Sequence, residues 1–306
     1  MYKKNTIVTA FFPINREEWK GFERSNNKYI EYFKFWARMH NDMVIYTNSF
    51  FSSEIKRIRD EYGRYNTKIV EINDINLIDK ELYNSIINVS KNNKSVDFRI
   101  YPEFPESWNA DYNYTVCLKA WFVQDAVTRF NIDGIASWID FGFNHGGEVY
   151  IDSKDFDFEW NFDFDDKINI FLKHEMDDKP IFEICRKMDT YVHGSIMIAP
   201  TSMWGKFWNE TRNKMMCLNE IGLMDDDQTI TLMVYRAHPS WFSTHLLERW
   251  HTMLIYFSNQ KFKINIQDAF NLNGIKKIKS SVRYRMVIGK YQKKWKKIMI
   301  REEVKG

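Results

Sequence analysis

The segment IASWIDFGFNHGG, residues 135–147, carries the pattern that decides the fold of this chain. Its apolar first half, residues 135–139, predicts a buried strand, and its polar, glycine-rich second half predicts a flexible turn. Ligands of open α/β sheets bind at the carboxyl ends of strands, and Asp140 stands at such an end. A carboxylate there can reach a cation or a phosphate-bound metal. A turn cap is the structural alternative for Asp140.

Upstream of this segment, predicted strands and helices alternate. Strands are expected at 6–12, 43–47 and 68–72, and helices at 29–39, 54–62 and, before the central strand, 109–130. The first five elements, joined by short connections, predict parallel strands with right-handed crossovers, which begin a nucleotide-binding type of α/β sheet. The sequence has no GxGxxG or Walker glycine loop, so dinucleotide-dependent and P-loop enzymes are disfavoured.

Composition indicates a globular protein, because 44% of the 306 residues are hydrophobic and 28% are charged. The aromatic content of 17% suits carbohydrate-binding faces, although cores also use rings. No apolar run reaches the roughly 20 residues of a membrane span, and the N-terminus lacks the features of a signal sequence. Three widely spaced cysteines predict reduced thiols, exclude a CxxC metal site and favour a cytoplasmic location.

Two acidic segments are candidate functional regions. Residues 152–166, DSKDFDFEWNFDFDD, alternate rings with polar residues at period two. This pattern predicts an exposed β-hairpin or edge strand that packs its rings on the domain, with a sugar-stacking platform or a calcium loop as alternatives. Residues 225–228, DDDQ, directly precede a predicted helix at 229–235. One acid there can stabilise the helix dipole, but the repulsion among three requires a cation, a basic group or solvent.

The C-terminal tail, residues 274–306, is expected to form a unit separate from residues 1–273. It holds twelve Lys or Arg residues against Glu302 and Glu303, whereas the whole chain has a net charge of only +3. Its basic residues alternate with Trp295 and several isoleucines, which predicts a basic amphipathic helix that binds anionic membranes. We therefore expect peripheral contact with the inner face of the cytoplasmic membrane through residues 276–305. A solvated helix packed on the domain is the alternative.

Four phrases of the sequence resemble the bacterial HtrL/YibB-like proteins, often encoded among surface-polysaccharide genes. They are TAFFPINREEW (9–19), RSNNKYIEYFKFWARMHNDMVIYT (24–47), NADYNYTVCLKAWFVQDA (109–126) and WIDFGFNHGG (138–147). Members of this family look like GT-A glycosyltransferases. The resemblance implies an α/β, GT-A-like fold with a Rossmann-like mixed sheet flanked by helices. It also implies a UDP-linked sugar donor, Mn²⁺ or Mg²⁺ as cofactor, and a lipid-linked or polysaccharide acceptor in O-antigen, capsule or lipooligosaccharide synthesis.

The resemblance also assigns site residues. In the DDDQ segment it implies a catalytic base, Asp227 as first choice and Asp226 as second, that takes the proton of the acceptor hydroxyl. Asp140 matches the last carboxylate of the DxD metal signature, but Trp138 stands in the place of its first Asp. The metal ligands implied are Asp140, His245 and His145, with His251 as another histidine that can complete the shell. The donor-binding residues implied are Thr9, Ala10, Phe11, Arg16, Asp111, Lys119 and Asp140.

Three rival functions follow from the same residues. A catalytically inert carbohydrate-binding or assembly protein on a degenerate sugar-nucleotide fold agrees with the incomplete DxD signature. Nucleic-acid binding has support only from the basic tail, and the acidic remainder of the chain argues against it. Glycoside hydrolysis requires two carboxyl groups about 5 to 10 Å apart, a spacing that a sequence does not reveal.

Overall fold

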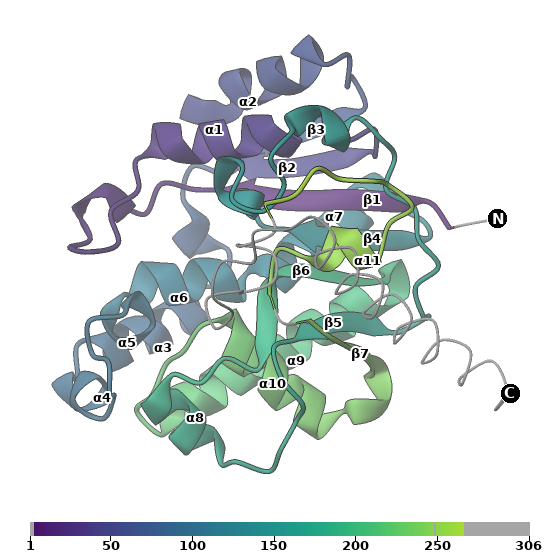
Figure 1. Cartoon of the computed structure of the whole chain (residues 1–306). Coiled ribbons are helices and arrows are strands. Elements are labelled where there is room, and N and C mark those ends of the chain that lie inside the picture. The colour runs from purple at the N-terminus through teal and green to yellow at the C-terminus, as the bar shows by residue number, and fades with distance from the viewer. Residues whose placement is uncertain (1–2, 248, 266–306) are drawn as a thin grey trace, which may run out of the picture. The chain divides into compact units, whose positions relative to one another are not determined.

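The computed structural model describes residues 3–247 and 249–265, which form a seven-stranded mixed sheet flanked by helices (Figure 1). The strands are β1 (Asn5–Phe11), β2 (Met43–Thr47), β3 (Thr67–Glu71), β4 (Ile135–Ile139), β5 (Ile168–Leu172), β6 (Val192–Pro200) and β7 (Phe242–Leu246). Across the sheet they lie in the order β3-β2-β1-β4-β6-β5-β7. Strands β3, β2, β1 and β4 are parallel, and β6 is antiparallel to both β4 and β5. The expected α/β class, with a Rossmann-like mixed sheet flanked by helices, is confirmed.

Eleven α-helices lie within the described residues. They are α1 (Asn26–Trp36), α2 (Ser49–Glu61), α3 (Lys80–Ser90), α4 (Asn93–Asp97), α5 (Pro105–Trp108), α6 (Ala110–Cys117), α7 (Lys119–Phe130), α8 (Ile181–Lys187), α9 (Thr201–Glu220), α10 (Asp227–Ala237) and α11 (Met253–Tyr256). Short 3₁₀ helices occur at Arg16–Glu18, Ile75–Leu77, Phe143–Gly146, Ser153–Phe156 and Pro239–Trp241. Polar side chains cap several helix starts; Asn109, for example, accepts a hydrogen bond from the backbone N–H of Tyr112.

The sheet is covered on both faces, as a largely parallel sheet requires. On one face α7 packs against β1, β4 and α9, and Phe122 of α7 stacks on Trp138 of β4. On the other face Phe33 of α1 stacks on Phe141, the residue after Asp140. All five residues of β4 are buried, and the chain turns just after it, at the carboxyl edge of the sheet.

Several local expectations were wrong. The helix expected at 109–130 is two helices, α6 and α7, with Leu118 between them. Strands β5 and β7 were not expected. Strand β5 directly follows residues 152–166, for which a hairpin was predicted, and β7 lies in a stretch with partly helical periodicity. Strand β7 is an edge strand with alternating exposure, and its neighbours in the sheet decide its conformation rather than its own propensity.

The acidic and aromatic tract at 152–166 does not form the expected hairpin. It contains one 3₁₀ helix and otherwise neither helix nor strand, although several of its rings do turn inward: Phe156, Trp160 and Phe164 are buried. Asn41 explains the absence of a strand partner, because its side chain accepts a hydrogen bond from the backbone N–H of Trp160 and donates one to the Trp160 carbonyl. Period-two burial therefore arises here without a β-ladder.

Within residues 3–247 and 249–265, none of the helices combines the length and the hydropathy that crossing a bilayer demands. The basic tail at 274–306 lies outside the described residues, so its expected helix and membrane contact stay predictions.

Candidate functional site

A cavity of about 470 Å³ opens at the carboxyl edge of β1 and β4. Its lining includes Phe11 at the end of β1, Asp140 just after β4, and Asp227 at the start of α10. The antiparallel strand β6 begins at this same edge, and the backbone N–H of Asp140 donates to the Ser195 carbonyl at 2.8 Å. The position is the one where open α/β sheets bind ligands.

Three charged side chains in this cavity form what we call the ion centre: Lys119, Asp140 and Asp227. The Lys119 ammonium lies 3.0 Å from Asp140 Oδ1 and 3.0 Å from Asp227 Oδ2. It also donates to the carbonyl of Gly194 at 2.9 Å, so each of its three N–H groups has an acceptor. Burial favours the neutral amine, but the two carboxylates outweigh burial and hold the pKa of Lys119 above its usual value.

Asp227 is a buried carboxyl group with a raised pKa. Burial raises its pKa, the Lys119 ammonium offsets part of that rise, and Asp140 adds to it, which leaves the pKa of Asp227 at about 6. A carboxyl group with a pKa near the working pH is a strong proton acceptor that is still largely ionised at neutrality. The sequence-based choice of Asp227 therefore places a suitable group in the cavity.

The surroundings of Asp140 do not fit a divalent cation. Its Oδ1 atom accepts a hydrogen bond from Trp138 Nε1 at 2.7 Å and pairs with the Lys119 ammonium at 3.0 Å. The ammonium supplies the positive charge that a metal would supply, and it would repel a second cation at this carboxylate. Trp138, the residue that the resemblance puts in the place of the first Asp of a DxD signature, is itself a donor to Asp140.

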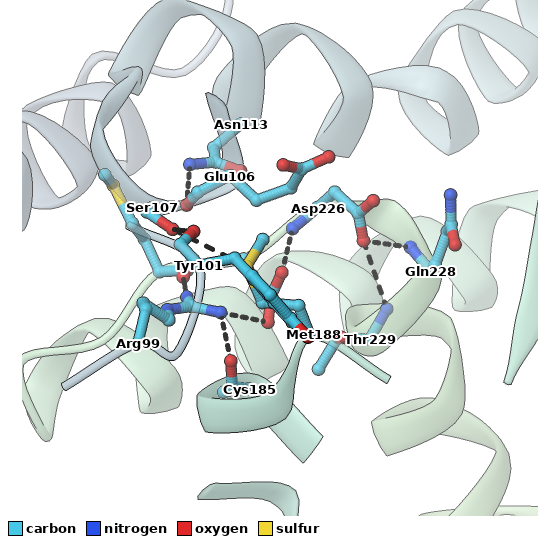
Figure 2. Close-up of polar contacts among 12 residues, drawn as sticks. Arg99, Tyr101, Glu106, Ser107, Asn113, Cys185, Met188, Asp226, Gln228 and Thr229 are labelled. Atoms are coloured by element: carbon cyan, nitrogen blue, oxygen red, sulfur yellow. Dashed lines mark hydrogen bonds and ion pairs between the residues drawn. The ribbon is translucent and has the colours of Figure 1, made fainter. Parts of the chain in front are cut away.

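The other two acids of the DDDQ segment have structural roles, and Figure 2 shows the bonds that Asp226 accepts from Gln228 and Thr229. Asp225 pairs with the buried Arg99 at 3.1 Å, and Arg99 also donates to the Cys185 carbonyl. Asp226 caps α10 through hydrogen bonds from the backbone N–H groups of Gln228 and Thr229. Burial, with Asp225 and Asp227 close by, raises the pKa of Asp226 well above its usual value. Asp226 does not line the cavity.

The three histidines proposed as metal ligands lie in two places. His145 lines the cavity, and its Nε2 atom is 3.2 Å from an Arg24 nitrogen. His251 is close to it, with ring centroids 5.3 Å apart. His245 lies apart, on β7, where its Nε2 atom bonds to Asn169 Oδ1 at 2.9 Å. The structure therefore brings His145 and His251 together and places His245 elsewhere, on β7.

Only some of the residues proposed for donor binding line the cavity. Ala10, Phe11, Arg16, Lys119 and Asp140 line the cavity. Thr9 is fully buried within β1 and does not reach the cavity surface. Asp111 is also outside it and accepts a hydrogen bond from the hydroxyl of Tyr83 at 2.9 Å. Helix α6 carries Asp111 on its outer side, whereas its neighbour Tyr112 lines the cavity.

Sequence reasoning missed several residues of the cavity, among them Gly194. A Cβ atom added at Gly194 would overlap Asp227 Oδ2. A glycine within an otherwise apolar strand is the signal that another group approaches closely, and HGSIMIAP contains one. Lys173, Arg249 and Trp250 also line the cavity, and nothing in their local sequence marks them.

With Asp227 as the catalytic base proposed from the sequence, we expect Gly194→Ala to lower turnover about a hundredfold, because displacement of a catalytic group by about 1 Å can have that effect. Its added methyl group must push the Asp227 carboxylate away from Lys119. Steady-state kinetics will measure this, with Gly205→Ala as the matched control. A Cβ at Gly205 in α9 meets only Gln124 Cγ, at 3.9 Å, so the control should keep full activity. Full activity in Gly194→Ala would show that the site tolerates a displaced Asp227.

Known proteins resemble the chain over most of its length. A profile of the family described as "Bacterial protein of unknown function (HtrL_YibB)" matches residues 3–259. Protein HtrL of Escherichia coli (strain K12) is 29% identical over 266 residues, 81% of this chain and 90% of that protein. The crystal structure of apo mouse xyloside xylosyltransferase 1 has a TM-score of 0.42 and 11% identity, covering 79% of this chain and 84% of that one. A cytidylyltransferase from Leptospira borgpetersenii serovar Hardjo-bovis (strain JB197) has a TM-score of 0.35 and 12% identity, covering 96% of each chain. At these TM-scores, neither structural likeness bears on the reaction of this chain.

Proposed function

The chain belongs to the bacterial HtrL/YibB family, and from its cavity we propose that it is a glycosyltransferase. The proposed donor is a nucleotide sugar, UDP-linked, and the proposed acceptor is a lipid-linked or polysaccharide glycan of the bacterial surface. The donor class is supported by the cavity. The acceptor, the cytoplasmic location and the contact of residues 276–305 with an anionic membrane are proposals from the sequence alone.

The observation that carries this proposal is the ion centre inside a cavity whose other charged residues are basic. Among the described residues that line the cavity, Asp140 and Asp227 are the acids. The basic side chains beside the ion centre are Arg16, Arg24, Lys173 and Arg249. Guanidinium and ammonium groups pair with phosphate oxygens, so the cavity suits an anionic diphosphate next to one carboxylate base.

The geometry supports a single displacement. Asp227 accepts the proton of the acceptor hydroxyl while that oxygen forms a bond to the anomeric carbon. The bond between the anomeric carbon and the diphosphate oxygen breaks, and the bond electrons leave with the diphosphate. Basic side chains of the cavity stabilise the charge that develops on this leaving group. Lys119 keeps Asp227 ionised and oriented, because it is anchored to Asp140 and to the Gly194 carbonyl.

Thermal denaturation with a panel of nucleotide sugars tests the proposal. At a hundred times its dissociation constant, a donor should add about 2.7 kcal/mol to the stability of the folded chain and raise Tm by several degrees. Arg16→Ala should weaken this stabilisation, because Arg16 lines the cavity. Arg129→Ala is the matched control, since Arg129 pairs with Asp125 on the outer surface of α7.

A rise in Tm with one uridine donor, followed by its turnover, would support the transferase. No rise with any nucleotide sugar would contradict it and favour the inert carbohydrate-binding alternative. An equal effect of the donor on both arginine variants would place donor binding outside this cavity.

A further inference from the structure

We infer that His145, Glu148 and His251 form a binding site for a divalent transition-metal ion beside the cavity, separate from the ion centre. The three residues come from the loop after β4 and from the segment before α11. One ligand atom from each lies within 4.8 Å of the other two. The inference goes beyond the proposed transfer reaction, since it depends on these contacts and not on the identity of the substrate.

The distances suit one ion. Glu148 Oε2 is 2.8 Å from His145 Nδ1 and 3.3 Å from His251 Nε2. Ligands about 2.1 Å from a tetrahedral metal are roughly 3.4 Å from one another, so the Glu148 and His251 atoms, at 3.3 Å, already have close to the required spacing. The His145 and Glu148 atoms, at 2.8 Å, need to separate by about 0.6 Å. Glu148 is exposed enough for an ion to enter, with 42% of its side chain accessible.

His251 is buried and incompletely satisfied. Its side chain is 2% exposed; its Nδ1 atom has no partner among the described residues, and its Nε2 atom has only the 3.3 Å contact with Glu148 Oε2. Buried polar atoms are normally well hydrogen-bonded, so this ring is a reason to look for a ligand. The Nε2 atom of this ring faces Glu148, so an ion held there would satisfy it.

The loop that carries two of the ligands is fixed in a demanding conformation. Asn144 and His145 both have positive φ, at 61° and 45°, in the region that side chains other than glycine rarely adopt. The Asn144 side chain stabilises the loop by accepting from the backbone N–H groups of Val149 and Tyr150 and by donating to the Tyr150 carbonyl. This closed loop places His145 and Glu148 side by side before any ion binds.

The ligand chemistry selects the class of ion. Imidazole nitrogens suit first-row transition metals, whereas Mg²⁺ prefers oxygen ligands and keeps several of its waters. Two imidazoles and one carboxylate leave open coordination positions, as in other sites of this composition. Of the two cofactors expected from the sequence, Mn²⁺ therefore fits this site better than Mg²⁺.

Arg24 couples the metal site to the cavity. It lies against His145 Nε2, so without metal that nitrogen accepts from Arg24 and the proton of the neutral ring is on Nδ1, facing Glu148. A metal on Nδ1 requires the other tautomer, with the proton on Nε2. Arg24 then loses its acceptor on His145. Because Arg24 lines the cavity, its guanidinium becomes available to an anionic ligand there.

Titration calorimetry of the full, chelator-treated chain with Mn²⁺, Zn²⁺ and Mg²⁺, without any nucleotide sugar, tests the site. We expect one Mn²⁺ or Zn²⁺ per chain, with Mg²⁺ at least about tenfold weaker. Glu148→Gln should weaken Mn²⁺ binding about tenfold or more, since even residues behind the ligands have effects of this size. Its side chain is exposed, so this variant should fold, and circular dichroism will check that it does.

Two further variants sharpen the test. His245→Gln is the matched control, because His245 bonds to Asn169 away from the proposed metal site. The affinity of this variant for Mn²⁺ should equal that of the wild-type chain. Arg24→Gln should bind Mn²⁺ several-fold more tightly, because the competing donor to His145 is gone. Absence of stoichiometric binding, or equal affinity in the wild-type chain and Glu148→Gln, would overturn the site. An unchanged or lower affinity in Arg24→Gln would overturn the coupling. Since no donor is present, failure of the transferase proposal leaves these results unaffected.

Discussion

Asp227→Asn is expected to lower the rate of sugar transfer by between about a hundredfold and ten-thousandfold while donor affinity changes little, because a general base contributes this much to catalysis. The amide has the shape of the carboxylate, and its oxygen can still accept from Lys119, which lies 3.0 Å from Asp227 Oδ2. What the variant loses is the ability to take a proton. Steady-state kinetics will give the rate, and calorimetry with the donor alone will give the affinity.

Asp226→Asn is the matched control for this prediction. Asp226 adjoins Asp227 and is equally buried, but its oxygen accepts from the backbone N–H groups at the start of α10. Asn is also a good N-cap, and its side-chain oxygen can accept from the same two backbone N–H groups. We therefore expect nearly wild-type transfer. The reverse result, an inactive Asp226→Asn and an active Asp227→Asn, would make Asp226 the base.

The pH dependence of kcat/KM gives a second readout of the same base. Asp227 must be ionised to accept a proton, so activity should rise as the pH increases through the pKa of Asp227, about 6. The rise should be tenfold per pH unit well below that value and level off above it. Asp227→Asn should lack this acidic limb. A wild-type profile that is flat from pH 5 to pH 8 would contradict the assignment.

The parts of this site that the sequence predicts are those encoded by local pattern. An apolar strand followed by Asp140 marks a sheet edge, and acids before an apolar helix mark the start of α10. Parallel strands bring the ends of β1 and β4 to one edge, where Phe11 and Asp140 line the same cavity as Asp227. The fold class follows from the same pattern, since the period of the apolar residues distinguishes strands from helices over most of the chain.

The remaining features depend on contacts between residues far apart in the chain. Lys119 is 108 residues from Asp227, and no local pattern shows that its ammonium joins two carboxylates instead of a phosphate. The antiparallel direction of β6, which brings Gly194 to this edge, also follows from packing. The sequence gives no reason to distinguish His251 from His245. The structure places His251 beside Glu148 and His245 beside Asn169.

Lys119→Met is expected to destabilise the folded chain by about 3 to 5 kcal/mol at pH 7, because removing one partner of a buried ion pair leaves uncompensated charge. Methionine has a similar length and cannot donate to Asp140, to Asp227 or to the Gly194 carbonyl. Urea unfolding followed by the fluorescence of the chain's 11 Trp residues will measure the difference. Activity should also fall, since Asp227 loses the group that orients it and keeps it ionised.

The pH dependence of the loss in stability caused by Lys119→Met identifies its cause. Without Lys119 the pKa of Asp227 in the folded chain rises further above its value in the unfolded chain. A carboxyl group raised in this way binds its proton more tightly when folded, so the penalty is present at high pH and is relieved as the pH falls through the folded pKa. The gap between Lys119→Met and the wild-type chain should therefore be largest at pH 7 and should narrow toward pH 5.

Lys34→Met is the control for the loss of a lysine as such. Lys34 pairs with Glu31 on the surface of α1, where the two side chains are 35% and 66% exposed, and such pairs contribute at most about 1 kcal/mol. Its effect should be small at every pH. If Lys119→Met costs no more than Lys34→Met, the Lys119 ammonium does not hold the two carboxylates. The objection to a metal at Asp140 would then fall as well, because it depends on that same ammonium. Unfolding curves of Lys119→Met and Lys34→Met therefore test both the ion pairs of Lys119 and the exclusion of a metal from Asp140.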